Sequence, residues 1–330
     1  MIYIKSPLRI TLGGGGSDLP WFYKKNGGYV LTTSIDKFIH LFGIKRVYDN
    51  KIWLSYSKNE ITENINNIKN EIIREALRYF NIDRSLELHT LSDVPGNSGL
   101  GSSGAFISTI LKFCSEHKSH SLSKYELAKL GCYLEMTKLK KNSGLQDQFI
   151  SVYGGIIEMF INTKGEVKVK KLKLKKKIKK KFLTSSVTFY TKLTRPSELV
   201  LRSQKKNYLK DIDKEKSMFE IIKIGKEIKK KLIVADIKGI GGLFHDHWQI
   251  KKNLANNMSN EFINNLYEYG IKCGAYGGKV IGAGGGGYIM FIIEPKKRKE
   301  FISKFKKFNL PILNWKFSEN GTSLIDNSSK

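Results

Sequence analysis

Residues 93–104 read Asp93-Val-Pro-Gly-Asn-Ser-Gly-Leu-Gly-Ser-Ser-Gly104, a glycine- and serine-rich stretch between two regular segments. Residues 86–91 before it are typical of an apolar strand, and residues 102–117 after it carry apolar side chains at helical spacing. Glycines let a backbone approach an anion closely, and a helix start offers unpaired N–H groups and a positive dipole end. The stretch therefore predicts a cradle for phosphate groups.

Two further glycine clusters, Gly13–Gly16 and Gly282–Gly287, stand near the two ends of the chain. A tight turn explains any one of the three loops as well as a ligand does. Three such loops in one chain favour a nucleotide and a second ligand held in one cleft.

The glycine loops nearly match two common nucleotide fingerprints, and both matches are rejected. The central loop has Walker A spacing, but Ser102 stands where that loop needs a lysine. Residues 99–104 have dinucleotide-loop spacing, which requires a second strand ending in an acid about 20 residues on. The next segment is instead another helix, with Ser123 and Glu126 spaced as a capping box. The cluster at 282–287 also has the dinucleotide-loop spacing, but it leads into a strand rather than a helix.

Residues 95–103, Pro-Gly-Asn-Ser-Gly-Leu-Gly-Ser-Ser, resemble the central motif of the GHMP kinases, the group of galactokinase, homoserine kinase, mevalonate kinase and phosphomevalonate kinase. Three other segments resemble the remaining motifs in the family's order. They are residues 6–18 (N-terminal motif), 144–151 (catalytic aspartate) and 277–287 (C-terminal glycine motif). The resemblance covers nearly the whole chain. It implies a lobe like ribosomal protein S5, a ferredoxin-like lobe, and ATP between them.

Within this family, the chain is most similar to a subgroup that phosphorylates sugars at C1. Residues 8–20, Leu-Arg-Ile-Thr-Leu-Gly-Gly-Gly-Gly-Ser-Asp-Leu-Pro, resemble the opening of the D-glycero-D-manno-heptose 7-phosphate kinases, whose relatives include fucokinase-type enzymes. Residues 190–197 and 247–252 fit the same subgroup. Lys192 stands where glycine is expected, a departure that bears on the local turn rather than on the chemistry.

Asp147 is the first candidate for a catalytic residue. It lies between two glutamines in a short polar segment before residues 149–153. The resemblance implies that this carboxylate faces the acceptor hydroxyl, as a base or as an orienting acceptor. An anomeric hydroxyl is more acidic than an ordinary alcohol, so strong base catalysis is not required. The alternative for this residue is an aspartate that caps a helix or a loop.

Arg9 is the second catalytic candidate. It lies in an extended apolar segment, residues 1–12, where an arginine must face either water or an anion. By resemblance to galactokinases, it would stabilise the transferring phosphoryl group or the charge of Asp147. A surface arginine is the alternative.

The resemblance places the phosphates of ATP on the backbone of the central loop. Phosphoryl transfer requires mainly positioning and charge neutralisation, and Mg²⁺ prefers oxygen ligands. One hydroxyl at the helix start, Ser102 or Ser103, is expected to ligate Mg²⁺, and the predicted metal site pairs Ser103 with Glu135. Glu135 precedes Asp147 by 12 residues, as the family's magnesium carboxylate does, although a solvated helix acid is the alternative. The predicted nucleotide-binding residues are Pro95, Gly96, Asn97, Ser98, Gly99, Leu100, Gly101, Ser102 and Ser103.

The acceptor is expected against the N-terminal and C-terminal glycine motifs. Asp18 resembles the family's acceptor of sugar hydroxyls, and a carboxylate suits them because it accepts hydrogen bonds on two oxygens. The acceptor's own phosphate needs a basic partner, for which Arg195, Arg202 and Lys279 are alternatives. The predicted substrate-binding residues are Gly15, Gly16, Ser17, Asp18, Arg195, Arg202, Lys279, Gly284 and Gly285.

The charge of the chain suggests a different function. The 58 lysines and arginines against 30 aspartates and glutamates give a formal net charge of +28, which normally favours a nucleic-acid or membrane partner. Only eight of these basic residues are arginines, whereas proteins that recognise specific nucleic-acid sequences tend to use the forked guanidinium group of arginine. Residues 167–174, in the densest lysine run, alternate as a strand with one wet face, so a solvated edge is predicted.

The 330 residues, 40% of them apolar, are enough for a large core in two lobes. Strands and helices mix without regular alternation, which favours an α+β fold over a doubly wound α/β fold. We expect an ATP-binding lobe over residues 1–182 and a second lobe over residues 183–330. The prediction includes a helix over 61–80, strands over 149–174 and a last strand near 312–317.

Other features limit the compartment and the partners. The odd set of three cysteines predicts reduced core thiols, and the six histidines show no metal-ligand spacing. No signal peptide or membrane-spanning run is found. A cytoplasmic protein with small-molecule ligands and no nucleic-acid or membrane partner is expected, and a homodimer is left open.

The motifs together predict an ATP- and Mg²⁺-dependent sugar kinase. It would phosphorylate the C1 hydroxyl of D-glycero-D-manno-heptose 7-phosphate to the 1,7-bisphosphate, which supplies nucleotide-activated heptose for a surface polysaccharide. One alternative is another sugar-1-kinase, such as a fucokinase-like enzyme. Another is a basic nucleic-acid-binding protein with an S5-like lobe, which would need neither Asp147 nor Glu135.

Overall fold

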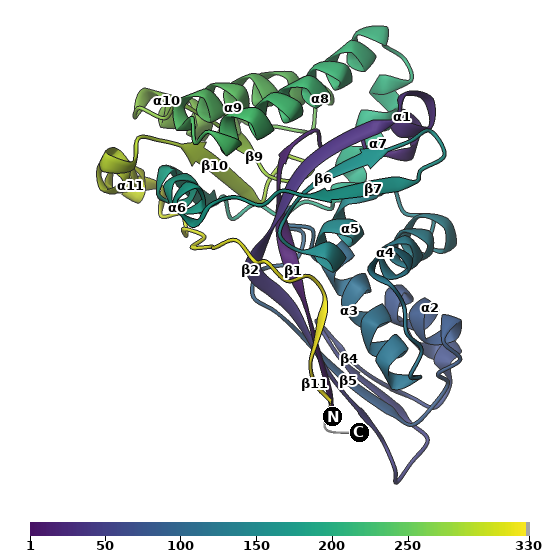
Figure 1. Ribbon diagram of the computed structural model, residues 1–330. Coiled ribbons are helices and arrows are strands. Elements are labelled where there is room, and N and C mark those ends of the chain that lie inside the picture. Colours follow the sequence, from purple (N-terminus) through teal and green to yellow (C-terminus); the bar gives the residue numbers. More distant parts are fainter. Residues whose placement is uncertain (328–330) are drawn as a thin grey trace.

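The computed structural model describes residues 1–327, which form two groups of elements, each built around a β-sheet (Figure 1). The first group comprises β1 (Ile2–Gly13), α1 (Pro20–Asn26), β2 (Gly28–Lys45), β3 (Ile52–Ser55), β4 (Asn59–Thr62), α2 (Glu71–Tyr79), β5 (Leu86–Ser92), α3 (Ser102–His117), α4 (Lys124–Cys132), α5 (Gln146–Tyr153), β6 (Ile156–Ile161) and β7 (Val167–Lys171). The second group comprises α6 (Lys176–Ser185), β8 (Ser186–Tyr190), α7 (Ser197–Tyr208), α8 (Ile212–Ile233), α9 (Ile237–Lys252), α10 (Glu261–Lys272), β9 (Gly277–Val280), β10 (Tyr288–Ile292) and α11 (Arg298–Phe305). A last strand, β11 (Ser323–Asn327), returns to the first sheet beside β1.

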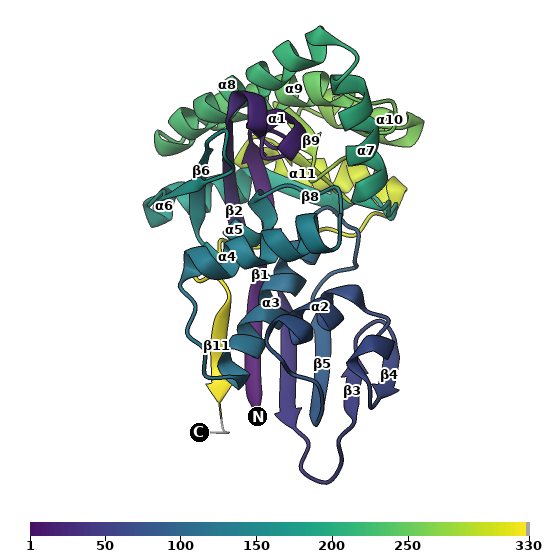
Figure 2. The same ribbon diagram turned by 90° about the vertical axis from the view of Figure 1, so that its right-hand side faces the viewer.

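The larger sheet is organised around β1 and β2, which pair antiparallel. Because β2 is 18 residues long, residues 28–33 pair with β6 while residues 39–45 pair with β5. The strand order is β11-β1-β2-β5-β3-β4, with β6 and β7 continuing from the other part of β2 (Figure 2). Helices α2 to α5 bury their apolar faces against this sheet in one hydrophobic cluster. Because α3 packs on the sheet in this way, its start and the glycine loop before it are held over the middle of the sheet.

The smaller sheet has the order β8-β10-β9, and a second apolar cluster joins it to the first group. This cluster combines Leu8 and Ile10 of β1 with Ile228 of α8, Phe244 of α9 and Met290 of β10, and all five side chains are fully buried. The two groups therefore share one continuous core. This core holds β1 between the helices that follow the central glycine loop and the helices α8 and α9.

The sequence predicted several elements correctly. The α+β class is confirmed, and α3 begins and ends at the predicted residues. Ser123 and Glu126 form the predicted capping box, with the serine hydroxyl accepting from Glu126 N and the glutamate accepting from Ser123 N. All three cysteines are free thiols, as expected, and Cys114 and Cys132 are buried, whereas Cys273 is only partly buried at the edge of the core.

Four local predictions were wrong. The helix expected over 61–80 begins only at Glu71, because residues 59–62 pair with β3 and the Asn70 side chain caps α2. Residues 149–153 belong to α5 rather than to a strand, since a short buried helix is apolar on most sides and loses its periodic signature.

The prediction also missed α1, although its proline at the first helical position is a start signal. At residues 312–317, only isolated bridges at Ile312 and Phe317 occur, and the final strand lies at 323–327. The expected boundary at residue 182 falls within α6, and the division into 1–182 and 183–330 stays a prediction.

Candidate active site

A cavity with about 1190 Å³ of empty space, open to solvent, lies where the three glycine-rich loops meet. Each loop contributes to its lining, through Gly15 and Gly16, through Gly99 and Gly101, and through Gly282, Gly284 and Gly286. The structure therefore brings together the three segments that the sequence singled out.

Two of these loops touch through backbone that leaves no room for side chains. A Cβ on Gly282 would lie 2.5 Å from the carbonyl oxygen of Gly99, and a Cβ on Gly99 would lie 2.6 Å from that of Ile281. Gly101 precedes α3 in the left-handed region, with φ of 77°. Only glycine accepts this conformation at little cost, and it leaves the N–H groups at the start of α3 facing the cavity.

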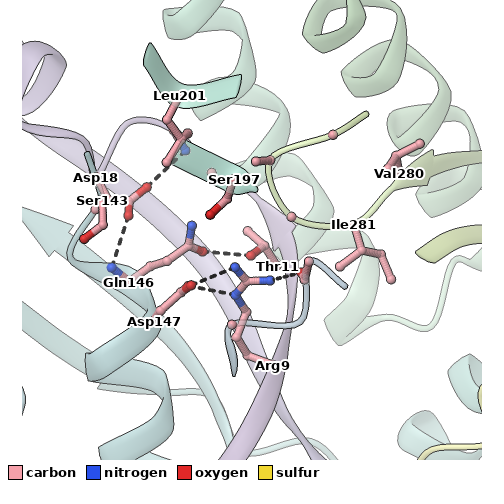
Figure 3. Close-up of a pocket in the computed structure, with 18 of the residues that line it drawn as sticks. Arg9, Thr11, Asp18, Ser143, Gln146, Asp147, Ser197, Leu201, Val280 and Ile281 are labelled. Atoms are coloured by element: carbon pink, nitrogen blue, oxygen red, sulfur yellow. Dashed lines mark hydrogen bonds and ion pairs between the residues drawn. The ribbon is translucent and has the colours of Figure 1, made fainter. Parts of the chain in front are cut away.

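Arg9 and Asp147 form a two-pronged ion pair on the cavity floor (Figure 3). Arg9 Nε donates to Asp147 Oδ1 at 2.8 Å and Nη2 donates to Oδ2 at 2.9 Å, while Nη1 donates to the carbonyl of Gly99. Arg9 is 6% exposed, so the alternative of a surface arginine is wrong. Such a paired guanidinium holds a carboxylate in one orientation and also touches the phosphate loop.

Asp147 lies in the first turn of α5, and α5 packs closely against α3. A Cβ on Gly104 would lie 2.5 Å from Asp147 Cβ, so the absence of a side chain at Gly104 allows this contact. Asp147 therefore stands beside the N-terminus of α3, within the same cavity as Ser102 and Ser103.

Glu135 lies in a π-helical turn, Tyr133–Lys138, which continues α4. Its carboxylate accepts hydrogen bonds from Ser103 Oγ at 2.5 Å, from Ser143 Oγ at 3.0 Å and from Gln148 Nε2. Burial raises the pKa of Glu135 above its usual value, and these donors oppose that shift. At 4% exposure it is not a solvated helix acid, which corrects that alternative.

The donor set around Glu135 fits a magnesium ion. Mg²⁺ is commonly bound by one or two carboxylates together with substrate phosphates, and it prefers hard oxygen donors. Ser103 Oγ and the Glu135 carboxylate are adjacent and both residues line the cavity, and Ser102 also lines it at the same helix start. Among residues 1–327, no cluster of three or more His, Cys, Asp or Glu side chains forms a complete metal cage.

Asp18 joins the N-terminal glycine loop to the segment that carries Asp147. Its Oδ1 accepts from Gly16 N at 3.0 Å and its Oδ2 from Gln146 N at 3.1 Å, and the side chain packs on Gly144. Burial raises the pKa of Asp18, and the charge of Asp147 adds to this effect. Each carboxylate oxygen accepts one of these two backbone hydrogen bonds and keeps further acceptor capacity.

The opposite wall of the cavity comes from α9 and β9, and its polar groups are basic. His247 and Lys251 are one turn apart on α9, and Lys279 lies on β9. Lys251 Nζ donates to the carbonyl of Gly282, and Lys279 Nζ donates to that of Leu12 at 2.5 Å. Burial and the neighbouring positive charges lower the pKa of Lys251 to about 8 and hold the pKa of Lys279 well below its usual range.

The structure separates the predicted basic residues. Arg195 and Lys279 line the cavity, and Arg195 Nη1 also donates to the carbonyl of Asn257 at 2.7 Å. Arg202 does not line it, because Ser197, Leu201 and Gln204 form the inward face of α7 and turn Arg202 to solvent. The structure therefore does not bring Arg202 into the cavity with the other two predicted basic residues.

Some predicted loop residues support the site without lining it. Ser17 turns its hydroxyl inward, where its one O–H lies within hydrogen-bond distance of the carbonyls of both Gly14 and Tyr29. Leu100 is a core side chain, and the side chain of Ser98 is buried. The others that lie outside the lining are Pro95, Gly96 and Gly285.

Sequence reasoning did not assign several residues that line the cavity. Ser143 and Gln146 fall inside or beside the recognised aspartate motif, and Gln204 lies on α7. His247 and Lys251 lie in a stretch that resembled the subgroup, and their i, i+4 spacing on a helix was the signal for a shared face. The departure at Lys192 changes the turn little, because Lys192 adopts φ of 60°, a conformation that glycine favours.

Comparison with known families identifies the class of this fold and site. A model described as the GHMP kinases N terminal domain matches residues 57–155, and the GHMP kinases C terminal model matches residues 228–309. A nucleotide-type loop, a paired aspartate and a buried glutamate beside it are the parts that a phosphotransferase uses. The chain belongs to the GHMP kinase family, and it is an enzyme of phosphoryl transfer rather than a binding protein.

Individual relatives cover the whole chain. The D-glycero-alpha-D-manno-heptose 7-phosphate kinase of Campylobacter jejuni is 30% identical over 97% of both chains. The bifunctional fucokinase/GDP-fucose pyrophosphorylase of Arabidopsis thaliana is 24% identical over 94% of this chain and 32% of its own. A crystal structure described as a D-glycero-D-manno-heptose 1-phosphate kinase from Bacteroides thetaiotaomicron superposes with a TM-score of 0.82 over 99% of both chains at 23% identity, which confirms the two-lobed fold.

Within residues 1–327, no helix combines the length and the apolar character needed to cross a membrane.

Proposed function

We propose that this enzyme transfers the γ-phosphoryl group of ATP to the anomeric (C1) hydroxyl of D-glycero-D-manno-heptose 7-phosphate, giving the 1,7-bisphosphate and ADP. The observation that carries the proposal is the Arg9–Asp147 pair beside the N-terminus of α3, in the cavity where the glycine loops meet. The 30% identity with the Campylobacter heptose 7-phosphate kinase supports the choice of acceptor.

Different residues carry out the separate steps of the reaction. Backbone N–H groups of the central loop and of the start of α3 bind the phosphates of ATP. Asp147 accepts the hydrogen bond of the C1 hydroxyl and takes its proton as the bond from that oxygen to the γ-phosphorus forms. The bond between this phosphorus and the bridging oxygen breaks, and ADP leaves. Arg9 orients Asp147 and neutralises charge on the phosphoryl group in transfer.

Ser103 and Glu135 would hold Mg²⁺, with Ser102 as the neighbouring hydroxyl. When bound, the ion neutralises phosphate charge and orients the phosphoryl group. Glu135 is already oriented for this role by the three side chains that donate to it.

The acceptor sugar occupies the part of the cavity near Asp18 and the C-terminal glycine loop. Asp18, with Gly15 and Gly16, accepts or surrounds the sugar hydroxyls, and Gly284 allows close approach on the other side. Of the three basic residues predicted for the acceptor's own phosphate, Arg195 and Lys279 line the cavity. The product feeds nucleotide-activated heptose for a surface polysaccharide, and we place the reaction in the cytoplasm.

The alternative acceptor is a free sugar such as fucose, which the 24% identity with the plant fucokinase favours. ADP release with Mg–ATP would be measured against D-glycero-D-manno-heptose 7-phosphate, mannose 6-phosphate, mannose, fucose and galactose. Turnover on the heptose phosphate that is lost in Asp147→Asn is the expected result. Turnover on a free sugar alone would replace the acceptor, and turnover on none would overturn the proposal.

A further inference from the structure

The wall formed by α9 and β9 holds positive charge that is only partly offset: the carboxylate of Asp18 acts on Lys251, but burial and the charge of Arg9 outweigh it and lower the pKa of Lys251. Among residues 1–327, neither Lys251 nor Lys279 forms an ion pair with a carboxylate. The Nζ of Lys251 donates to the carbonyl of Gly282, and the Nζ of Lys279 donates to the carbonyl of Leu12 and lies 4.6 Å from the centre of the Phe244 ring. Arg9 faces the same space, and its charge lowers the pKa of both lysines. Cations gathered away from water are costly unless an anion accompanies them.

His247 adds a second, independent observation. It is 2% exposed and lines the cavity, yet within the described part of the chain neither of its ring nitrogens has a hydrogen-bond partner. Burial and the charges of Lys279 and Lys251 hold the pKa of His247 well below its usual value. The imidazole is therefore neutral and keeps one N–H donor for a group that enters the cavity.

The position of Lys251 relates this wall to the two glycine loops. Its Nζ donates to the carbonyl of Gly282, and Gly282 packs directly on Gly99 of the phosphate loop. Lys251 therefore stands close to the central glycine loop, where the phosphates of ATP are expected. An ammonium has three donors and a neutral amine has two, so Lys251 and Lys279 each keep at least one donor beyond their carbonyl partners.

We propose that His247, Lys251 and Lys279 form a subsite for a phosphate monoester, occupied by the acceptor's own phosphate. This inference rests on the proposed function and deepens it, because it names the groups that distinguish a phosphorylated sugar from a free one. Lys251 supplies the principal charge, His247 donates its N–H to a phosphate oxygen, and Lys279 adds a donor from β9 beside them. Phosphate at the end of ATP is the other source of the same chemistry.

The test uses inorganic phosphate and needs no sugar and no turnover. Phosphate is titrated by calorimetry into protein saturated with Mg–AMPPNP, so that the central loop is occupied. Lys251→Met should weaken phosphate binding about tenfold to a hundredfold, the value of a charge-assisted hydrogen bond. Lys252→Met, one residue further on the same helix and outside the lining, is the matched control and should bind phosphate as the unmodified protein does.

A second pair of titrations separates the two sources. Lys251→Arg keeps the charge and should restore most of the phosphate affinity, which a merely misfolded site would not allow. If Lys251→Met weakens Mg–AMPPNP binding tenfold but leaves Mg–ADP binding unchanged, the subsite belongs to the γ-phosphate and the acceptor assignment is overturned. Unaltered phosphate and AMPPNP binding would overturn the subsite itself. Failure of the sugar panel alone would leave these titrations interpretable, because they involve no acceptor sugar.

Discussion

The two sides of the cavity carry opposite charges, and their polar groups differ in how many hydrogen-bond and ion-pair partners the chain gives them. On the first side, Glu135 has three side-chain donors and Asp147 has a two-pronged arginine. On the second side, His247 has no partner in the described residues and Lys251 has one carbonyl. The acidic side is therefore oriented by folding alone, whereas the basic side has capacity left for a ligand.

This difference separates chemistry from recognition. Groups that act in the transition state gain most when they are fixed before the substrate arrives, because no reorganisation is then needed. Groups that recognise a charged substrate bind it best when they break few hydrogen bonds within the protein to do so, because each broken hydrogen bond subtracts from the affinity. Substitutions on the two sides should therefore affect turnover and binding differently.

The largest effect is expected from Asp147→Asn, which keeps the shape but removes the proton acceptor and the ion pair with Arg9. The kcat should fall about 10²- to 10⁴-fold, the usual value of general acid–base catalysis, while the Kd for Mg–ADP stays unchanged. Steady-state kinetics and calorimetry check this. Asp246→Asn, at an exposed position of α9, should be silent. Normal turnover in Asp147→Asn would remove this carboxylate from the mechanism.

The next effect concerns the metal ligands on the acidic side. Losing an outer hydrogen-bond partner of a metal ligand usually costs roughly 10- to 100-fold in metal affinity. Glu135→Gln changes a ligand itself, so it should raise the Mg²⁺ concentration for half-maximal activity by at least this factor. Activity measured over a range of Mg²⁺ at saturating ATP checks this. Ser103→Ala should move the same midpoint in the same direction, and an indifferent Ser102→Ala, Ser103→Ala double variant would contradict the assignment.

A steric change tests how rigidly the acidic side is held. Gly104→Ala places a methyl group 2.5 Å from Asp147 Cβ and must push α5 from α3. We expect a loss of about 1–3 kcal/mol of stability, as for overpacking, together with lower kcat. In the control Gly242→Ala on α9, no heavy atom lies within 4 Å of the new Cβ, and stability should rise by about 0.5–1 kcal/mol. Urea denaturation measures both, and equal stabilities would contradict the close packing.

The smallest effect is a pH dependence on the basic side. Lys251 has a pKa of about 8 in the folded chain against an ordinary value of 10.5 in the unfolded chain, so between these pH values the unfolded chain binds more protons. Stability relative to Lys251→Met should therefore rise with pH in this window, by roughly 1–2 kcal/mol after solvent screening. Below about pH 8, the full cost of the buried ammonium is present.

Urea denaturation of both proteins across this window checks the pH dependence. Saturating inorganic phosphate should move the window to higher pH, because a bound dianion favours the ammonium. A flat difference between the two proteins would show that Lys251 titrates as an ordinary surface lysine.

The parts of the site that the sequence predicted are those that local chemistry specifies. The position before α3 has a left-handed backbone, which favours glycine, and residues 102–117 carry apolar side chains at helical spacing. Both features could therefore be predicted from the sequence. Asp147 was found by its motif, but its helix was missed because the short α5 is buried on most sides. Arg195 and Arg202 were equivalent in the sequence, and only the packing of α7 separates them.

The residue order alone specified the glycine loops, the start of α3 and the family of the chain, because these depend on backbone freedom and on near neighbours in the sequence. Tertiary packing was needed to place α9 and β9 opposite the phosphate loop. Nothing near Lys251 in the sequence indicates that Gly282 will accept its hydrogen bond or that Arg9 will lower its pKa. Electrostatic effects depend on distance in space and on burial, and both arise only when residues far apart in the chain enclose one cavity.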